Sequence, residues 1–301
     1  MRAGLAAATI ALSACVFLGS ASLQADTIYR WKDRNGIVHY GDHRPDVPEG
    51  RVERIPVKAE IEAMVRLRIE EGDGVYRAWA ENALAGPIEV MLHFRTNKNM
   101  TSQPALPARA LVRANASSLV ANLHAIDDSK SGSFEVRLEG VPGNPNAKPV
   151  PFDYLVPLLR DRIRIDQGFN GQFSHRDAQN RHALDFAANT GTPVVAARGG
   201  VVMQVASDFD KAGLSEKYGG RANFVRILHD DGTMALYAHL QESGVHVRVG
   251  QRVRQGQRIG LSGNTGFTSG PHLHFVVQVN RGMRLESIPI RMRGPQGLLR
   301  F

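Results

Sequence analysis

The sequence predicts a mostly β protein in three parts: an N-terminal β-hairpin module, a β-sandwich middle domain and an antiparallel β domain at the C-terminal end. Apolar and polar residues alternate with a period of two in several runs, which is the pattern of half-buried strands. Turn-forming dipeptides such as Asn35-Gly36 and Asp231-Gly232 interrupt these runs. Helical periodicity is scarce after residue 152. We therefore expect strands to build all three parts.

Residues 1–25 are typical of a secretory signal peptide. Arg2 supplies a short positive start, an apolar run follows from Gly4, and Ala25 ends a small-residue tail. The apolar run is too short for a stable membrane span. Cys15, the only cysteine, lies inside this segment, so mature protein would have no disulfide and no thiolate metal site. An alternative is lipoprotein processing at Cys15, but the apolar residues after it fit an exposed start poorly. We expect a periplasmic or secreted protein.

The composition indicates a globular chain with an excess of basic residues. Of its 301 residues, 43% are hydrophobic and 22% are charged, which excludes a disordered polymer. Lysine and arginine number 37 against 29 acidic residues, a formal net charge of +8. A basic surface favours anionic partners. Export and the dispersed charges argue against nucleic acid, and an acidic cell-wall polymer fits both.

The first mature segment, residues 26–58, predicts a small β module. Two short β-prone runs flank Asn35-Gly36, and the second of them ends in His39-Tyr40. The segment resembles the small N-terminal module of unknown function found on many exported proteobacterial proteins. His39 and His43 are interpreted as surface or hairpin residues.

Residues 59–151 predict a β-sandwich-like domain followed by a linker. Between Ile88 and Phe94, and again between Phe134 and Leu138, every second residue is apolar. Gly, Pro and Asn separate such runs, as in antiparallel sandwiches. His93 and His124 are isolated, which favours structural roles, and the Pro-rich run 141–149 predicts a long turn or linker.

The last part, residues 152–301, holds seven of the 11 histidines. Two strands, 224–229 and 233–240, are expected to join at Asp230-Asp231-Gly232. Strict alternation in the second strand places His239 on the face opposite Met234 and Leu236. His229, at the hairpin end, and His246, in a polar turn, are expected at the surface.

Paired histidines in a late strand point to a metal site. In the run His272-Leu273-His274-Phe275 alternation puts both histidines on one face of the strand. One can bind a metal ion while the other reaches the water on that metal. A catalytic zinc site needs three protein ligands and an open position, and without cysteine the candidates are His, Asp and Glu. Residues 174–187 offer both His and Asp. Zinc in such a set lowers the pKa of its water and polarises a carbonyl group.

With these motifs, the last domain is similar to the lysostaphin/LytM-type zinc metallopeptidases, which cut peptide bonds in bacterial peptidoglycan. The resemblance implies an antiparallel β domain with a groove over one zinc ion. It also implies that Asp185 and His274 are zinc ligands and that His239 and His272 are the non-ligand catalytic histidines. The matching residues are Asp185-Phe186-Ala187, Gly191-Thr192-Pro193-Val194, Tyr237-Ala238-His239-Leu240, Gly250-Gln251, Gly256-Gln257, Gly263-Asn264-Thr265-Gly266 and Ser269 to Phe275.

The first zinc ligand departs from the common family pattern. That pattern has a histidine four residues before the aspartate, where this chain has Arg181. His182 lies three residues before Asp185, on the opposite face of a regular strand, and His175 lies ten before it. Family members with a similar Gly-Phe-Asn-Gly and Ser-His arrangement use the earlier histidine. We therefore choose His175 over His182, which is expected to line the groove or to pack.

The resemblance implies an exported zinc endopeptidase that hydrolyses peptide cross-links of peptidoglycan. A non-catalytic activator of cell-wall amidases is one alternative, because some relatives have lost ligands, although here every ligand position is occupied. A wall-binding protein acting through its middle domain is another. No residue pattern identifies a cell-wall or division-machinery partner.

Overall fold

The structure is a computed structural model that describes residues 27–32, 38–41, 52–56, 64–160, 162–215, 218 and 221–301. The chain divides into two compact units, residues 1–62 and 63–301. The described residues contain no α-helix, in agreement with the predicted β class. Accordingly, the described part of the chain has no helix that could cross a membrane.

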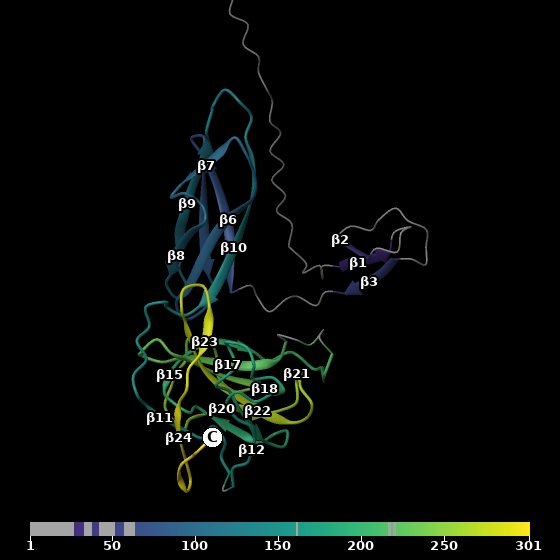
Figure 1. The fold of residues 1–301 in the computed structure, drawn as a ribbon, viewed down its shortest axis with the longest axis vertical. Helices are drawn as coiled ribbons and strands as arrows, with labels where there is room; N and C mark the ends of the chain where they lie inside the picture. The colour runs from purple at the N-terminus through teal and green to yellow at the C-terminus, as the bar shows by residue number, and fades with distance from the viewer. Residues whose placement is uncertain are drawn as a thin grey trace, which may run out of the picture. The chain divides into compact units, whose positions relative to one another are not determined.

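The first unit contains a small three-stranded sheet (Figure 1). Its strands, in the order β2-β1-β3, are β1 (Thr27–Lys32), β2 (Val38–Gly41) and β3 (Val52–Pro56). β1 and β2 pair antiparallel, with Lys32 opposite Val38, so the predicted hairpin is confirmed. His39 lies opposite Trp31. The predicted signal segment with Cys15, the Asn35-Gly36 turn and His43 lie outside the described residues.

The second unit begins with the predicted sandwich, in which two antiparallel sheets enclose one core (Figure 1). Along β6, Ile88, Val90 and Leu92 are fully buried, while Met91 and His93 are only partly covered. The strand predicted from the period-two pattern is therefore present. The first sheet is β4 (Val65–Gly72), β5 (Val75–Asn82), β9 (Ser117–Ala125) and β7 (Met100–Gln103); the second is β10 (Ser133–Pro142), β6 (Ile88–Lys98) and β8 (Ala108–Val112).

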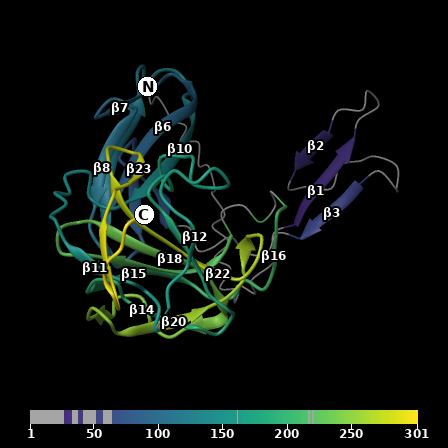
Figure 2. The same ribbon diagram turned by 60° about the horizontal axis from the view of Figure 1, so that its bottom comes forward.

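A ten-stranded sheet forms the C-terminal part (Figure 2). Its main path runs through β12 (Ile165–Gln167), β13 (Leu184–Ala187), β22 (His272–Asn280), β18 (Met234–Val245), β17 (Asn223–Leu228), β15 (Gly200–Ala206) and β19 (Arg252–Val253). β14 (Pro193–Val195), β20 (Arg258–Ser262) and β23 (Leu285–Ser287) attach to it. Its pairings are antiparallel, as predicted. Two short pairs outside it are parallel: β11 (Asp153–Leu155) with β24 (Arg291–Gly294), which also pairs with β25 (Gly297–Leu298), and β16 (Ala212–Gly213) with β21 (Gly266–Phe267).

The hairpin of β17 and β18 shows why the face predicted for His239 was wrong. The Asp-Gly turn is present, with Leu228 opposite Met234. However, Ala238 pairs with Phe224 and Leu240 with Asn223, so β18 has one extra residue, His239. This β-bulge gives His239 a positive φ of 61° and ends the strict alternation. His239 therefore lies in the same groove as Leu236 and Ala238.

The hydrophobic core lies on the other face of this hairpin. Tyr237 and Phe275 are fully buried, and their rings lie 5.1 Å apart. The Tyr237 hydroxyl accepts a hydrogen bond from the backbone N–H of Ala197, which satisfies a polar group inside the core. The groove face of β18 and β22 is therefore the one that carries polar side chains.

The sandwich and the large sheet share buried side chains. Met203 of β15 and Met234 of β18 belong to the sandwich core and are fully buried. The backbone N–H of Ala85 donates to the Met203 carbonyl, and Asn280 Nδ2 donates to Gly143 O at 3.2 Å. Residues 63–301 are thus held together by apolar packing and by backbone hydrogen bonds.

Candidate metal centre

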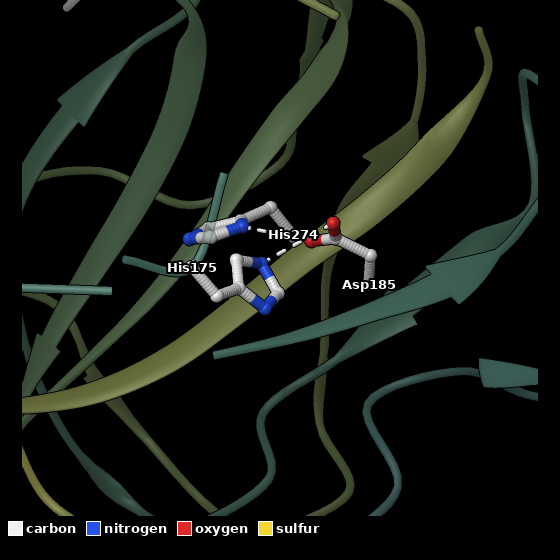
Figure 3. A group of neighbouring side chains, drawn as sticks. All are labelled: His175, Asp185 and His274. Carbon is white, nitrogen blue, oxygen red and sulfur yellow. Dashed lines mark hydrogen bonds and ion pairs between the residues drawn. The ribbon is translucent and has the colours of Figure 1, made fainter. Parts of the chain in front are cut away.

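Three side chains from separate segments converge at the end of β22 (Figure 3). β13 pairs antiparallel with β22 so that Asp185 lies directly opposite His274. Opposite residues in a sheet project to the same face, which brings the carboxylate to the imidazole. His175 comes from the loop between β12 and β13.

The donor atoms of these three residues all lie within 4.8 Å of one another. His175 Nε2 is 3.2 Å from Asp185 Oδ2, and His274 Nδ1 is 2.8 Å from Asp185 Oδ1. All three side chains are buried, with 1%, 8% and 9% of the residue exposed for His175, Asp185 and His274. Donors around a tetrahedral zinc ion lie roughly 3.4 Å apart at normal zinc–ligand distances, so this spacing is close to a ligand set.

The loop before His175 holds its ring in one orientation. The backbone N–H of His175 donates to Gly171 O, and ring atom Nδ1 lies 2.8 Å from Gly168 O. A carbonyl only accepts, so Nδ1 carries the proton and Nε2 is a free acceptor. Nε2 is buried and has no hydrogen-bond partner. A metal ion would satisfy this buried, unprotonated nitrogen. The residues present therefore fit zinc.

The electrostatics of the cluster keep its carboxylate charged. Burial alone would raise the pKa of Asp185, but the imidazoles of His175 and His274 beside it hold that pKa well below its usual range. Burial works against a charge on His175, yet the neighbouring Asp185 carboxylate raises the pKa of this imidazole. An ionised carboxylate surrounded by nitrogen donors is suited to a divalent cation.

Two further histidines adjoin the cluster without being part of it. The rings of His239 and His272 lie 4.6 Å apart, and His272 Nε2 is 3.8 Å from Asp185 Oδ1. His239 Nδ1 donates to Thr265 O and His272 Nδ1 to Gly270 O, which leaves Nε2 of each ring as an acceptor. Burial, together with repulsion from His272 and His274, lowers the pKa of His239 to about 3, so it is neutral at pH 7.

These side chains lie in a groove of about 640 Å³. Asp185, His239, His272 and His274 line it, and the rings of Phe173 and Phe267, which also line it, stack 6.4 Å apart. No described residue of the sandwich is among the lining residues. The groove is thus a feature of the C-terminal part.

The remaining histidines lie elsewhere. His182 Nδ1 lies 3.0 Å from Ser287 O, and its ring packs against Phe169, away from the groove. His246 is exposed, as predicted. The surface position predicted for His229 is wrong, because this residue is 2% exposed and its Nδ1 donates to Gly199 O. Burial lowers the pKa of His229 to about 4.

Sequence reasoning missed one residue that joins two of these segments. Gln167 Nε2 donates to Asp185 Oδ2 at 3.0 Å, and its Oε1 accepts from the backbone N–H of Phe173. The amide therefore ties the carboxylate to the loop that carries His175. An isolated glutamine in a short strand belongs to no spacing pattern, so no signal in the sequence marks it.

Two segments of the chain match known protein families. Residues 179–285 match peptidase family M23, and residues 15–63 match a domain of unknown function, DUF4124. The first match begins four residues after His175. It therefore covers Asp185 and His274 and leaves His175 outside.

Curated relatives match less than half of the chain. An uncharacterised metalloprotease of Haemophilus influenzae is 33% identical over 141 residues, which are 46% of this chain and 27% of that protein. A peptidoglycan DD-endopeptidase of Vibrio cholerae is 39% identical over 115 residues, covering 37% of this chain and 24% of that protein. The chain thus spans about a quarter of the length of these relatives. The catalytic domain of lysostaphin from Staphylococcus simulans is 36% identical with a TM-score of 0.29, over 39% of this chain and 81% of that domain.

Proposed function

Since residues 179–285 form a peptidase family M23 domain, with a DUF4124 module before it, we propose that this protein is a zinc metalloendopeptidase that hydrolyses peptide cross-links of peptidoglycan. The observation that carries the proposal is the cluster of His175, Asp185 and His274 at a groove that also holds His239 and His272. Relatives named as peptidoglycan DD-endopeptidases support the substrate class.

His175, Asp185 and His274 would hold the zinc ion. When bound, zinc supplies a Lewis acid that polarises a peptide carbonyl and lowers the pKa of water. The hydrogen bond from His175 Nδ1 to Gly168 O directs Nε2 at the ion, and Asp185 contributes negative charge. Carbonyl or carboxylate partners of this kind fix the ring orientation of metal-binding histidines.

His239 and His272 are the proposed catalytic histidines that do not bind zinc. Both present Nε2, because Nδ1 of each ring is held by a backbone carbonyl. Either ring can accept the proton of the attacking water, and the imidazolium that forms can then stabilise negative charge on the scissile carbonyl oxygen or pass the proton to the leaving amine. His239 is neutral at pH 7, so its Nε2 keeps a free lone pair toward the groove.

Peptidoglycan lies outside the cytoplasm, so the proposal includes export by the segment 1–25 into the periplasm or beyond. The net charge of +8 favours approach to an anionic wall. A non-catalytic role as an activator of cell-wall amidases is the second candidate. The complete His-Asp-His set disfavours it, because a regulator has no need of three buried metal donors.

Metal removal tests the proposal. Purified protein is treated with a chelator, desalted, and assayed on cross-linked peptidoglycan for new amino groups before and after addition of equimolar zinc. We expect activity to disappear with the metal and to return with zinc. Zinc-loaded protein that releases no amino groups, while it stimulates an added amidase, would favour the second candidate.

A further inference from the structure

A buried arginine lies in the floor of the groove at a distance from the metal centre. Arg226 of β17 lines the groove and is 8% exposed. It lies opposite Leu236 of β18, which in turn lies opposite Val276 of β22. Leu236 also lines the groove, which places the guanidinium on the face that carries His274.

The guanidinium has few partners for a buried cation. Its Nη1 donates to Gln278 Oε1 at 2.8 Å, and its Nε is buried without a partner. Within the described part of the chain, no acidic side chain forms an ion pair with it. Burial lowers the pKa of Arg226 to about 10, so the group is still charged at neutral pH. A buried charge is normally paired, since an unpaired one loses its hydration without compensation.

Gln278 fixes the direction of this group. Its side chain is 2% exposed, and its Nε2 donates to Gln179 O while its Oε1 receives Arg226. This hydrogen bond fixes the plane of the guanidinium that faces the groove. Carboxylates suit this geometry because they accept two parallel N–H bonds.

The sheet register gives the distance from the metal centre. Val276, in the row of Arg226, is two residues from His274 along β22, and β17 lies two strands from β22. With normal strand dimensions, this offset is about 7 Å along the strands and about 10 Å across them. The backbones of Arg226 and His274 are therefore about 12 Å apart. An extended peptide covers that distance in three to four residues at about 3.3 Å each.

We propose that Arg226 binds a carboxylate of the substrate peptide, three to four residues from the bond that is cut. The inference rests on the proposed function and gives it a substrate class: extended peptides with a free carboxylate at that position. The carboxylate is supplied by an acidic side chain or by a peptide C-terminus. The groove thus has two anchor points, the metal for the scissile carbonyl and Arg226 for the charge.

Amidation of the substrate tests this assignment. Cross-linked muropeptide dimers are compared with synthetic copies in which either the side-chain carboxylates or the C-terminal carboxylate are amides. Wild type runs beside Arg226→Met, Arg226→Lys and the control Arg258→Met, which removes an exposed positive charge outside the groove. The kcat/KM value is measured for each pair of protein and substrate.

We expect Arg226→Met to lose about 10- to 100-fold in kcat/KM on the free-acid dimers, the size of a lost charge-assisted hydrogen bond. Amidation of the recognised carboxylate should cost wild type the same factor and cost Arg226→Met nothing more. The amide that has this effect identifies the source of the carboxylate. Arg226→Lys should be intermediate, because it keeps the charge without the fork, and Arg258→Met should match wild type.

Two results would overturn the assignment. Arg226→Met could lose activity equally on free-acid and amidated dimers, or it could lose none. If wild type cuts no dimer at all, the proposed function fails instead. The carboxylate site is then tested alone, by equilibrium binding of the free-acid and amidated peptides to wild type and Arg226→Met.

Discussion

At the residue scale, His175 and His182 have different surroundings although they belong to the same loop. His175 is buried beside Asp185, whereas His182 contacts Ser287 and Phe169. We expect His175→Ala to lower zinc affinity by about 100-fold or more, since loss of a ligand should exceed the 10- to 100-fold cost of losing a partner of a ligand. His182→Ala, the matched control, should stay within about threefold of wild type.

Competition with a chromogenic chelator measures both affinities. Loss of zinc from His182→Ala, with zinc kept by His175→Ala, would reverse the choice of ligand.

His229 makes stability depend on pH at a site away from the metal centre. Burial lowers its pKa from about 6.5 to about 4, with Arg198 opposing and Asp231 favouring the charged form. Between these two values the unfolded chain binds more protons than the folded one, so the free energy of unfolding falls as the pH falls. The expected loss from pH 7 to pH 4 is about 3 kcal/mol from this residue.

Urea denaturation at several pH values tests this expectation. His229→Gln keeps an N–H donor but cannot titrate, so its stability should fall less steeply than that of wild type. His246→Gln, an exposed control, should keep the wild-type slope. Parallel slopes for wild type and His229→Gln would show that His229 does not titrate in this range.

At the element scale, the loop Gly263–Gly266 orients His239, one of the two proposed catalytic histidines. Thr265 O accepts the hydrogen bond of His239, and Thr265 Oγ1 donates to Leu240 O. Gly266 has a φ of 86°, and a Cβ there would lie 2.1 Å from Arg221 O. The loop can approach Arg221, just before β17, this closely only because it has no side chain at that position.

We expect Gly266→Ala to lower the free energy of unfolding by about 3 kcal/mol, since it combines an unfavourable φ with a backbone clash. Gly250→Ala is the matched control, because Gly250 has a φ of 83° with nothing within 4 Å of its Cβ position. It should cost only about 1 kcal/mol. Equal costs, measured by urea denaturation, would mean that the close approach at Gly266 has no energetic weight.

Strands β22 and β18 show what the alternation of apolar and polar residues can and cannot predict. The run from His272 to Phe275 follows it, so the sequence correctly places His272 and His274 on the groove face and Phe275 in the core. Strand β18 does not, because the bulge at His239 adds a residue that only pairing with β17 reveals. Residue patterns report local periodicity, whereas a bulge is set by the partner strand.

Long-range contacts explain the other differences. His175 meets Asp185 through a loop whose course depends on Gly168 and Gly171, and alternation along a strand does not extend through it. His229 resembles a turn residue in the sequence, yet the segment around Gly199 covers it. The roles of Arg226 and Gln167 depend on contacts that only the folded sheet provides. Gln278 lies beside Arg226, and Asp185 lies beside Gln167.

At the scale of the whole molecule, Met203 connects the sandwich to the large sheet. It is fully buried in the sandwich core, although it belongs to β15. Met203→Asp should lower the free energy of unfolding by about 4 kcal/mol or more, because it buries an unpaired charge. Val249→Asp, at a position 42% exposed, should change it by less than about 0.5 kcal/mol.

Two probes tell whether residues 63–301 unfold as one unit. In a Trp31→Phe background, which leaves Trp79 of the sandwich as the one tryptophan, fluorescence and release of zinc from the C-terminal part should change at the same urea concentration. Both transitions should move together in Met203→Asp. Separate transitions in this background would show that the shared packing does not couple the two parts.

The central claim is that the His175, Asp185 and His274 centre cuts peptide cross-links. Digestion of purified, cross-linked peptidoglycan by mature protein, with the muropeptides identified by mass, tests it most directly. Bound zinc is counted for wild type, His274→Ala and His182→Ala. We expect cross-linked dimers to disappear with wild type and His182→Ala, and to persist with His274→Ala, which should also lack zinc. Dimers that persist with zinc-loaded wild type, or that disappear equally with His274→Ala, would contradict the account.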